Sequence, residues 1–376
     1  MSDKLKQLRC GIDKIDEEIL ELLKKRENLV AEACEEKNKI GAAAYSVQRE
    51  DEILEHVEIY AKELSLPQGL ASDLYRRIVR ESYKGFGIGT YAKTLKEDKD
   101  IVIVGGNGGM GRIFTRYFEN SGYRVYCFGH SGWDKAESYL KNAKAVIVTV
   151  PIDVTKDVIK RLAPLLREDQ ILCDFTSVKG PIVDEMLKHH KGPVLGLHPM
   201  FGPDVKSLVK QVIVTVPSRD EQASRFLVDQ FKLYGARIVK CDAYEHDKAM
   251  SIIQALRHFT TYAYGTFMAK LNPNLHKLLE LSSPIYRLEL MMVGRLFAQD
   301  PRLYADIIMS SKQNFELISS YIESLKPELS TVASLDQDAF TQRFLEAREY
   351  FGDFSLNSLK ESGSLLAKLQ DERLSF

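Results

Sequence analysis

The chain has 376 residues, of which 44% are hydrophobic and 28% charged, and its 52 basic and 53 acidic side chains leave a net charge of −1. This length suits two or three domains, and the balanced charge excludes a sequence-wide electrostatic footprint for nucleic acid. The charged first six residues exclude a secretory signal and no stretch approaches the ~18 apolar residues of a membrane helix, so we expect a cytoplasmic protein without nucleic-acid or membrane partners.

The first 90 residues carry a helical pattern. Apolar residues recur at spacings of three and four over residues 4–40, which predicts one long amphipathic helix. Ser46 is placed to cap a second helix over 47–64, and a third is expected over 70–83. A helix ~50 Å long cannot bury its apolar stripe within a three-helix unit. A second chain is therefore predicted to cover it, as in a homodimer.

The pattern changes at about residue 99 to short β-rich runs that alternate with segments of helical length. These runs occupy residues 101–104, 124–128, 145–150, 171–174, 194–197, 212–216 and 237–239. Such alternation predicts a mainly parallel, doubly wound sheet of the Rossmann-like kind.

No strand signal follows residue 244, and helices are expected over residues 250–271, 284–297, 303–325 and 336–354. The predicted architecture is multidomain: all-α helices over 1–90, an α/β Rossmann-like domain over 99–243 and an all-α domain over 244–376, with a linker at 85–100. The five cysteines lack a C-x-x-C pair. We expect reduced core thiols and no metal site or disulfide.

A glycine-rich turn follows the first predicted strand. Gly106, Gly108 and Gly111 fit the G-x-G-x-x-G pattern, in which glycines allow a tight turn, close approach to a pyrophosphate and helix–strand packing. The alternative is a glycine-rich turn without a ligand. The setting between a buried strand and a helix favours a dinucleotide site formed by Gly106, Gly108, Met110 and Gly111.

The choice of dinucleotide is open. An NAD site usually has Asp or Glu about 20 residues after the glycines, at the end of the second strand. Gly129 stands there, followed by His130 and Ser131, and no Arg is present to meet the 2′-phosphate of NADP. We expect NAD, with NADP not excluded.

Five stretches of the sequence carry a resemblance to a known family. The block Gly192–Asp204, GPVLGLHPMFGPD, together with Ser177-Val178-Lys179 and Gln254-Ala255-Leu256-Arg257-His258, resembles prephenate dehydrogenases. The stretches SSPIYRLEL at 282–290 and GRLFAQDP at 294–301 are similar to the bifunctional T-proteins of enteric-type bacteria. The N-terminal helices resemble the all-helical chorismate mutases. The resemblance implies an enzyme of tyrosine biosynthesis that converts chorismate to prephenate and then, with NAD, prephenate to 4-hydroxyphenylpyruvate.

His198 and Ser177 each follow a predicted strand, where ligands bind in such sheets. A neutral His at this place accepts the proton of a substrate hydroxyl while hydride leaves the carbon, although a His at a strand end is also often structural. The resemblance assigns His198 to the 4-hydroxyl of prephenate, with Ser177 assisting.

The resemblance also implies a set of substrate-binding residues. Arg295 would bind a substrate carboxylate, with an ion pair to Glu289 or Asp300 as the alternative. His258 would lie near the prephenate ring and take part in feedback inhibition by tyrosine, or else be a packed core residue. The other candidates are His246, Lys179, Arg287 and Tyr304.

The mutase reaction needs a cationic pocket rather than a nucleophile. The resemblance places its residues at Arg9, Arg26, Lys37, Arg49, Glu50 and Ser82. Arg26 and Lys37 share a helix face, whereas Arg9 lies 17 residues before Arg26, ~25 Å away along the axis, so it would act from a second protomer. Two departures from the family pattern are Ser46, where many mutases have Asp, and Phe86, where Gln or Glu usually points at the ether oxygen.

Two alternatives stay open. The dehydrogenase could be NADP-linked or accept arogenate, because of Gly129. The N-terminal helices could be a non-catalytic dimerisation or regulatory module, because charges on a surface helix are usually only solvated.

Overall fold

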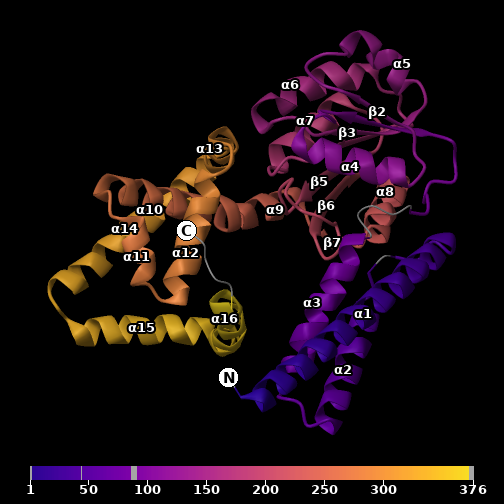
Figure 1. The fold of residues 1–376 in the computed structure, drawn as a ribbon. Helices are drawn as coiled ribbons and strands as arrows, with labels where there is room; N and C mark the ends of the chain where they lie inside the picture. The colour runs from indigo at the N-terminus through magenta and orange to yellow at the C-terminus, as the bar shows by residue number, and fades with distance from the viewer. Residues whose placement is uncertain (1, 44, 86–90, 372–376) are drawn as a thin grey trace. The chain divides into compact units, whose positions relative to one another are not determined.

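The computed structural model describes residues 2–43, 45–85 and 91–371 (Figure 1). Two compact units make up the chain, one ending at His246 and the other beginning at Asp247. No helix in the described residues combines the length and apolar character needed to cross a bilayer. The predicted boundary between residues 1–90 and 99–243 falls inside the first unit, and all the domain boundaries stay predictions.

The first unit begins with three helices that lie side by side (Figure 1): α1 (Asp3–Lys39), α2 (Val47–Glu63) and α3 (Leu70–Gly85). The predicted cap is confirmed, because Ser46 accepts a hydrogen bond from the backbone N–H of Arg49 at 3.2 Å. No residue of α1 is buried within the chain. Its exposed apolar side chains include Leu8, Ile12, Ile15, Ile19, Leu22 and Leu29.

A seven-stranded sheet follows, and all seven predicted strands are confirmed. They are β1 (Asp100–Val104), β2 (Val125–Phe128), β3 (Ala143–Val148), β4 (Ile171–Asp174), β5 (Val194–Pro199), β6 (Val212–Arg219) and β7 (Arg237–Lys240). Their order is β2-β1-β3-β4-β5-β6-β7, and every neighbouring pair is parallel except β5 with β6. The strands β1, β4 and β5 therefore end at the same edge of the sheet.

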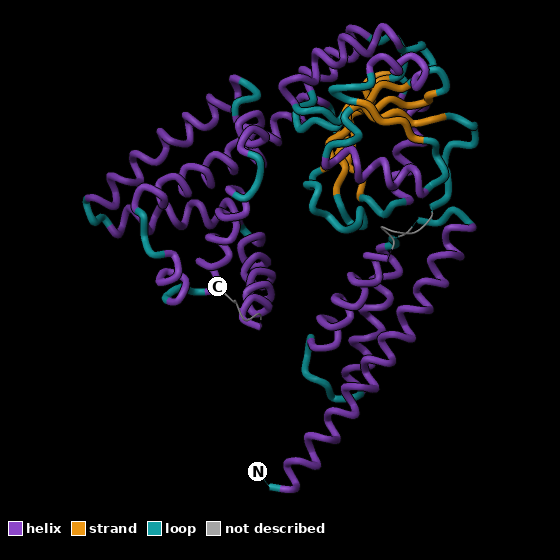
Figure 2. Tube along the Cα trace, turned by 45° about the horizontal axis from the view of Figure 1, so that its top comes forward, coloured by secondary structure: helices purple, strands orange, loops and turns teal. Residues whose placement is uncertain are grey.

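Helices cover both faces of this sheet (Figure 2). Successive residues of a strand point to opposite faces, so Ile101 and Ile103 pack with α4 and α8, while Val102 and Val104 pack with α5, α6 and α7. These helices are α4 (Gly109–Asn120), α5 (Ala136–Leu140), α6 (Ile152–Leu162), α7 (Gly180–His189) and α8 (Glu221–Leu233), with short 3₁₀ turns at Trp133–Lys135 and Ala163–Leu165. The arrangement is the predicted doubly wound fold.

The second unit is helical, as predicted; α9 spans its boundary with the first. Its elements are α9 (Ala243–Met250), a π-helical segment (Ser251–Leu256), α10 (Arg257–Leu271), α11 (Leu275–Glu280), α12 (Pro284–Phe297), α13 (Pro301–Ile308), α14 (Lys312–Ala333), α15 (Gln337–Phe351) and α16 (Asp353–Asp371).

Two expectations for this unit are wrong. The single helix predicted over residues 303–325 is divided into α13 and α14, because the Asn314 side chain bonds the carbonyl oxygens of Ile307 and Ile308 and Ser311 caps the new helix. The helical prediction also ended at residue 354, whereas α16 continues the chain after a turn at Gly352, which has a φ of +48°.

In the first unit, Cys10 is exposed on α1 and so is not the core thiol that we expected.

Candidate functional site

The glycine turn joins β1 to α4. Gly105 has a φ of +91°, so the left-handed position is one residue earlier than the first glycine of the predicted motif. A Cβ on Gly106 would lie 2.4 Å from Sγ of Cys127, and a Cβ on Gly111 would lie 2.5 Å from the carbonyl oxygen of Gly105. Side chains at these two positions would collide with β2 and with the turn itself. The turn is thus as tight as a pyrophosphate cradle requires, and it leads into the N-terminus of α4.

His198 lies near the carboxyl end of β5 and is 4% exposed. Its Nδ1 is 2.8 Å from Nε2 of His246, which is also buried. Burial first, and then the neighbouring His246 and the Lys179 ammonium, lower the pKa of His198 well below its ordinary value of 6.5. The imidazole is therefore neutral at physiological pH and suited to accept a proton.

An ion pair with no solvent exposure lies beside His198. Lys179 Nζ bonds Oδ2 of Asp174 and donates to the carbonyl oxygen of Leu197 at 2.8 Å. Asp174 ends β4, and Leu197 precedes His198 on β5. The Lys179 side chain thus links the carboxyl ends of β4 and β5 next to the imidazole of His198.

Ser177 follows β4 on the same edge of the sheet. Its Oγ is buried and has no hydrogen-bond partner within the described residues. The loop after β5 also reaches the glycine turn, since a Cβ on Gly109 would lie 2.9 Å from Cβ of Pro203. One edge of the sheet therefore holds the glycine turn, Ser177 and His198, as the sequence predicted from strand ends.

Four predicted substrate-binding residues lie in the second unit. The rings of His258 on α10 and Tyr304 on α13 meet edge to face, with centroids 4.9 Å apart. Burial and the adjacent Arg257 lower the pKa of His258. On α12, Arg295 is exposed, whereas Nε and Nη2 of Arg287 are buried without a hydrogen-bond partner within the described residues. The structure thus brings His258 and Tyr304 together.

The N-terminal helices form a second candidate site. Arg26 on α1 donates from Nη1 to Oγ of Ser82 on α3 at 2.8 Å. Arg49 on α2 pairs with Glu52 at 3.2 Å. Arg26 and Arg49 line one pocket, whose other residues are Glu52, Ile53, His56, Val57 and Tyr75. Two guanidinium groups at one pocket suit a ligand with two carboxylates.

The remaining predicted mutase residues are spread more widely. Glu50, which is 8% exposed, is engaged by Lys210 Nζ at 2.5 Å rather than by one of the predicted mutase cations. Arg9 and Arg26 lie on the unbroken helix α1, so their ~25 Å separation along the axis holds, and Lys37 lies near its end. Phe86 lies outside the described residues, so its predicted effect stays open.

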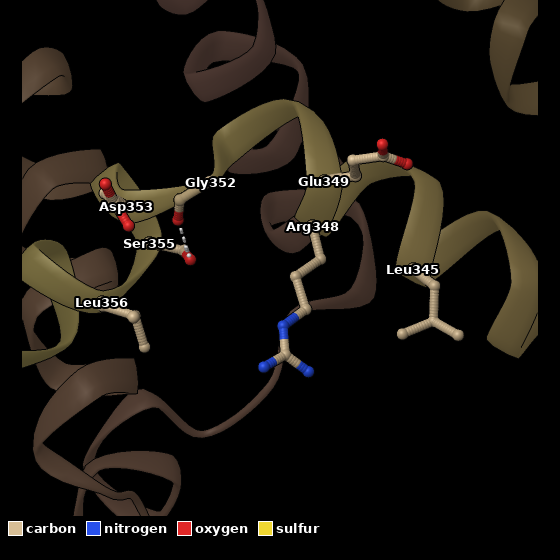
Figure 3. Close-up of a pocket in the computed structure, with 7 residues that line it drawn as sticks. All are labelled: Leu345, Arg348, Glu349, Gly352, Asp353, Ser355 and Leu356. Carbon is tan, nitrogen blue, oxygen red and sulfur yellow. Dashed lines mark hydrogen bonds between the residues drawn. The ribbon is translucent and has the colours of Figure 1, made fainter.

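A further pocket, drawn in Figure 3, lies where α15 meets α16. Leu345, Arg348 and Glu349 line it from α15, and Asp353, Ser355 and Leu356 from α16. Ser355 Oγ donates to the carbonyl oxygen of Gly352 at 2.7 Å across the turn. None of the predicted site residues lies in this pocket.

Three residues in these sites were not predicted: Asp174, Tyr83 and Lys210. Asp174 carried a visible signal, because it ends an apolar run five residues before Lys179. Tyr83 OH approaches Oε2 of Glu50 at 3.5 Å, and Lys210 reaches the same carboxylate from a loop of the sheet domain. No local pattern marks either of them. The described residues contain no cluster of three His, Cys, Asp or Glu side chains suited to a metal ion.

Three family models match successive parts of the chain. The family model for chorismate mutase type II matches residues 8–85, that for the prephenate dehydrogenase nucleotide-binding domain residues 131–240, and that for the prephenate dehydrogenase dimerization domain residues 242–346. The glycine turn lies before the second of these matches.

Curated relatives extend the match to the whole chain. The T-protein of Enterobacter agglomerans is 46% identical and covers 99% of this chain and 100% of its own. The T-protein of Haemophilus influenzae is 43% identical, with 98% of each chain covered. A solved prephenate dehydrogenase from Aquifex aeolicus, in complex with hydroxyphenyl propionate and NAD+, has the same fold, with a TM-score of 0.53, 19% identity, and 71% of this chain and 99% of its own covered. The chain belongs to the T-protein family, the bifunctional chorismate mutases and prephenate dehydrogenases of tyrosine biosynthesis.

Proposed function

We propose that the dehydrogenase half oxidises prephenate to 4-hydroxyphenylpyruvate with NAD, and that His198 is its base. The observation that carries this proposal is a buried, neutral imidazole at the strand edge that also holds the glycine turn. The NAD+ bound to the Aquifex aeolicus relative supports the choice of cofactor.

The residues of the turn fit a dinucleotide. Gly106 and Gly111 leave no room for a side chain, and a Cβ on Gly108 would lie 3.2 Å from the carbonyl oxygen of Gly105. No side chain caps the N-terminus of α4, so its first N–H groups would be able to bind an anion. Met110 lies in this first turn. When bound, the nicotinamide would supply the hydride acceptor.

His198 would accept the proton of the prephenate 4-hydroxyl as hydride leaves the same carbon. His246 would hold the ring of His198 through Nδ1, and Ser177 would donate its hydroxyl to the substrate. Lys179 would act behind them by fixing the strand ends. Loss of the ring carboxylate as CO2 makes the ring aromatic, so positioning and a modest base are sufficient.

The remaining predicted substrate-binding residues lie in the second unit. Arg295 and Arg287 are the candidates for the substrate carboxylates, because a guanidinium binds a carboxylate through two parallel hydrogen bonds. His258 and Tyr304 would lie near the ring, and His258 would take part in inhibition by tyrosine. The description of residues 242–346 as a dimerization domain supports a homodimer.

The mutase half would bind chorismate in the pocket of Arg26 and Arg49, with Lys37 on the same face of α1 as Arg26. Ser82 would hold Arg26, Glu50 would accept a hydrogen bond from a substrate hydroxyl, and Arg9 would come from the partner protomer. Cations placed around the ether oxygen would stabilise the charge that develops there. We propose that both reactions take place in the cytoplasm.

A prephenate-dependent absorbance assay tests the dehydrogenase proposal, run with NAD and NADP, with arogenate in place of prephenate, and with and without tyrosine. We expect NAD reduction with prephenate and a loss of about 10²–10⁴-fold in His198→Asn, which should keep its mutase activity. Equal loss of both activities would assign His198 a structural role. For the mutase, heat released on titration with a transition-state analogue would exclude the non-catalytic alternative.

A further inference from the structure

A contact between the N-terminal helices and the sheet domain (residues 99–243) has no part in the proposed function. Lys210, in the loop between β5 and β6 of the sheet domain, places Nζ 2.5 Å from Oε1 of Glu50 in the helical domain. The other carboxylate oxygen of Glu50, Oε2, lies 3.5 Å from the hydroxyl of Tyr83 on α3. The carboxylate is thus held from two sides, and one of them belongs to the dehydrogenase half of the chain.

The burial of Glu50 distinguishes its contact with Lys210 from an ordinary surface ion pair. The Glu50 side chain is 10% exposed, so it needs a nearby cation or hydrogen-bond donors to remain charged. Its place in the first turn of α2 favours negative charge as well. A carboxylate this deeply buried differs from the exposed i,i+3 and i,i+4 pairs along the helices, which contribute little.

The backbone at Lys210 is fixed in an uncommon conformation. Its φ is +64°, in the left-handed region, and its N–H donates to the carbonyl oxygen of Gly235 at 2.9 Å. Such a conformation persists only where the surroundings hold it. The Lys210 side chain therefore leaves the sheet domain in a defined direction.

Two tyrosine rings pack around the contact between Lys210 and Glu50. Lys210 Nζ lies 5.2 Å from the ring centroid of Tyr45, and the Tyr45 and Tyr83 rings meet edge to face at 5.6 Å. A Cβ on Gly235 would lie 3.3 Å from Cβ of Tyr45. The segment before α2 therefore packs directly on the turn at Gly235, whose carbonyl oxygen bonds Lys210. Burial, and then the neighbouring Glu50, raise the pKa of Tyr83.

We propose that Lys210 is a positioning residue of the mutase reaction, supplied by the dehydrogenase domain. It neutralises Glu50 and fixes the direction of its carboxylate, so that Glu50 offers an oxygen to the substrate hydroxyl in one geometry. This inference rests on the proposed role of Glu50 in the mutase site. The mutase of this chain accordingly depends on a side chain outside residues 1–90.

The test is a double-mutant cycle on the full-length protein, with mutase and dehydrogenase kinetics and thermal unfolding measured for each variant. Lys210→Ala should lower mutase kcat by about tenfold, with a smaller change in KM and dehydrogenase kcat/KM within twofold of the wild type. Lys210→Arg should recover most of this loss. Lys232→Ala is the matched control, because Lys232 forms an exposed pair with Asp229 on α8.

The cycle separates this inference from the proposed function. If Lys210 acts through Glu50, Lys210→Ala should add nothing to the mutase defect of Glu50→Gln. An active Lys210→Ala beside an inactive Glu50→Gln would overturn the positioning role and leave the function of Glu50 intact. An active Glu50→Gln would overturn both. Equal loss of the two activities with a lower melting temperature in Lys210→Ala and Lys210→Arg would make the pair only structural.

Discussion

Nδ1 of His198 lies 2.8 Å from Nε2 of His246, and both rings are buried in the first unit. The two imidazoles meet at an interplanar angle of 71°, so they are joined at one edge and are not stacked. This geometry fixes the ring of His198 and places a second titratable ring against it. His246 therefore affects both the orientation of the His198 ring and the pKa of this proposed base.

The pH dependence of the dehydrogenase follows from this pair. Because the pKa of His198 is lowered, its neutral form persists below pH 6.5, and the acid limb of log kcat/KM should lie below that value. Burial is the largest cause, but His246 contributes, so His246→Ala should raise the pKa of His198 and move the limb to higher pH. Steady-state kinetics from pH 4.5 to 9 measure the shift. A limb that stays in place in His246→Ala, or lies above pH 6.5 in the wild type, would contradict this account.

The buried pair of Lys179 and Asp174 has a different consequence, for stability. Neither side chain is exposed, and the Asp174 carboxylate also accepts from the N–H of Thr176 at 2.9 Å. Asp174→Asn would leave a buried ammonium without its counter-charge and should lower the free energy of unfolding by about 3–5 kcal/mol.

Lys179→Met combined with Asp174→Asn should recover part of that stability, because it removes both charges, as measured by denaturant unfolding. Dehydrogenase activity should stay low in the double variant, since Lys179 also bonds the residue before His198. If the double variant is the less stable of the two, the buried-charge explanation fails.

Strand ends were the most informative part of the sequence. Short β-rich runs of three to six residues predicted all seven strands, and the rule that ligands bind at carboxyl ends located the edge that holds His198 and Ser177. The division of α13 from α14 was missed although five polar residues, 310–314, lie at the break, where the side chain of Asn314 bonds the carbonyl oxygens of Ile307 and Ile308. Lys210 could not be predicted, because 160 residues separate it from Glu50 and no periodic pattern records so distant a pair.

Cofactor preference should depend on Gly129. A Cβ at this position would lie 3.8 Å from Cα and N of Gly105, an ordinary contact, so a side chain fits there. Gly129→Glu should raise the ratio of kcat/KM for NAD over NADP by at least about tenfold, because a carboxylate bonds the ribose hydroxyls and repels a 2′-phosphate. Gly129→Ala adds the Cβ without the charge and should leave the ratio near that of the wild type. Equal ratios in the two variants would place the ribose elsewhere.

The last prediction concerns the helix α1 and a second copy of the chain. Its apolar stripe, which includes Ile12, Ile15 and Ile19, is exposed in one chain, and Arg9 lies ~25 Å along the axis from Arg26. If Arg9 completes the partner's pocket, Arg9→Ala and Arg26→Ala should each be inactive as mutases. Co-refolding of the two in equal amounts should then restore about a quarter of wild-type activity, since half of the dimers are mixed and each holds one intact site.

A within-chain role for Arg9 predicts the opposite result, because every site in a mixed dimer would then lack one of the two arginines and no activity would return. Dehydrogenase activity measured in the same samples serves as the control for folding, since neither Arg9 nor Arg26 lies in the sheet domain. Affinity capture of the mixture, with one variant carrying a tag, would establish that mixed dimers had formed if the untagged variant is retained with it. Restored mutase activity would then require α1 helices of two chains to lie together, which is the arrangement that covers the apolar stripe.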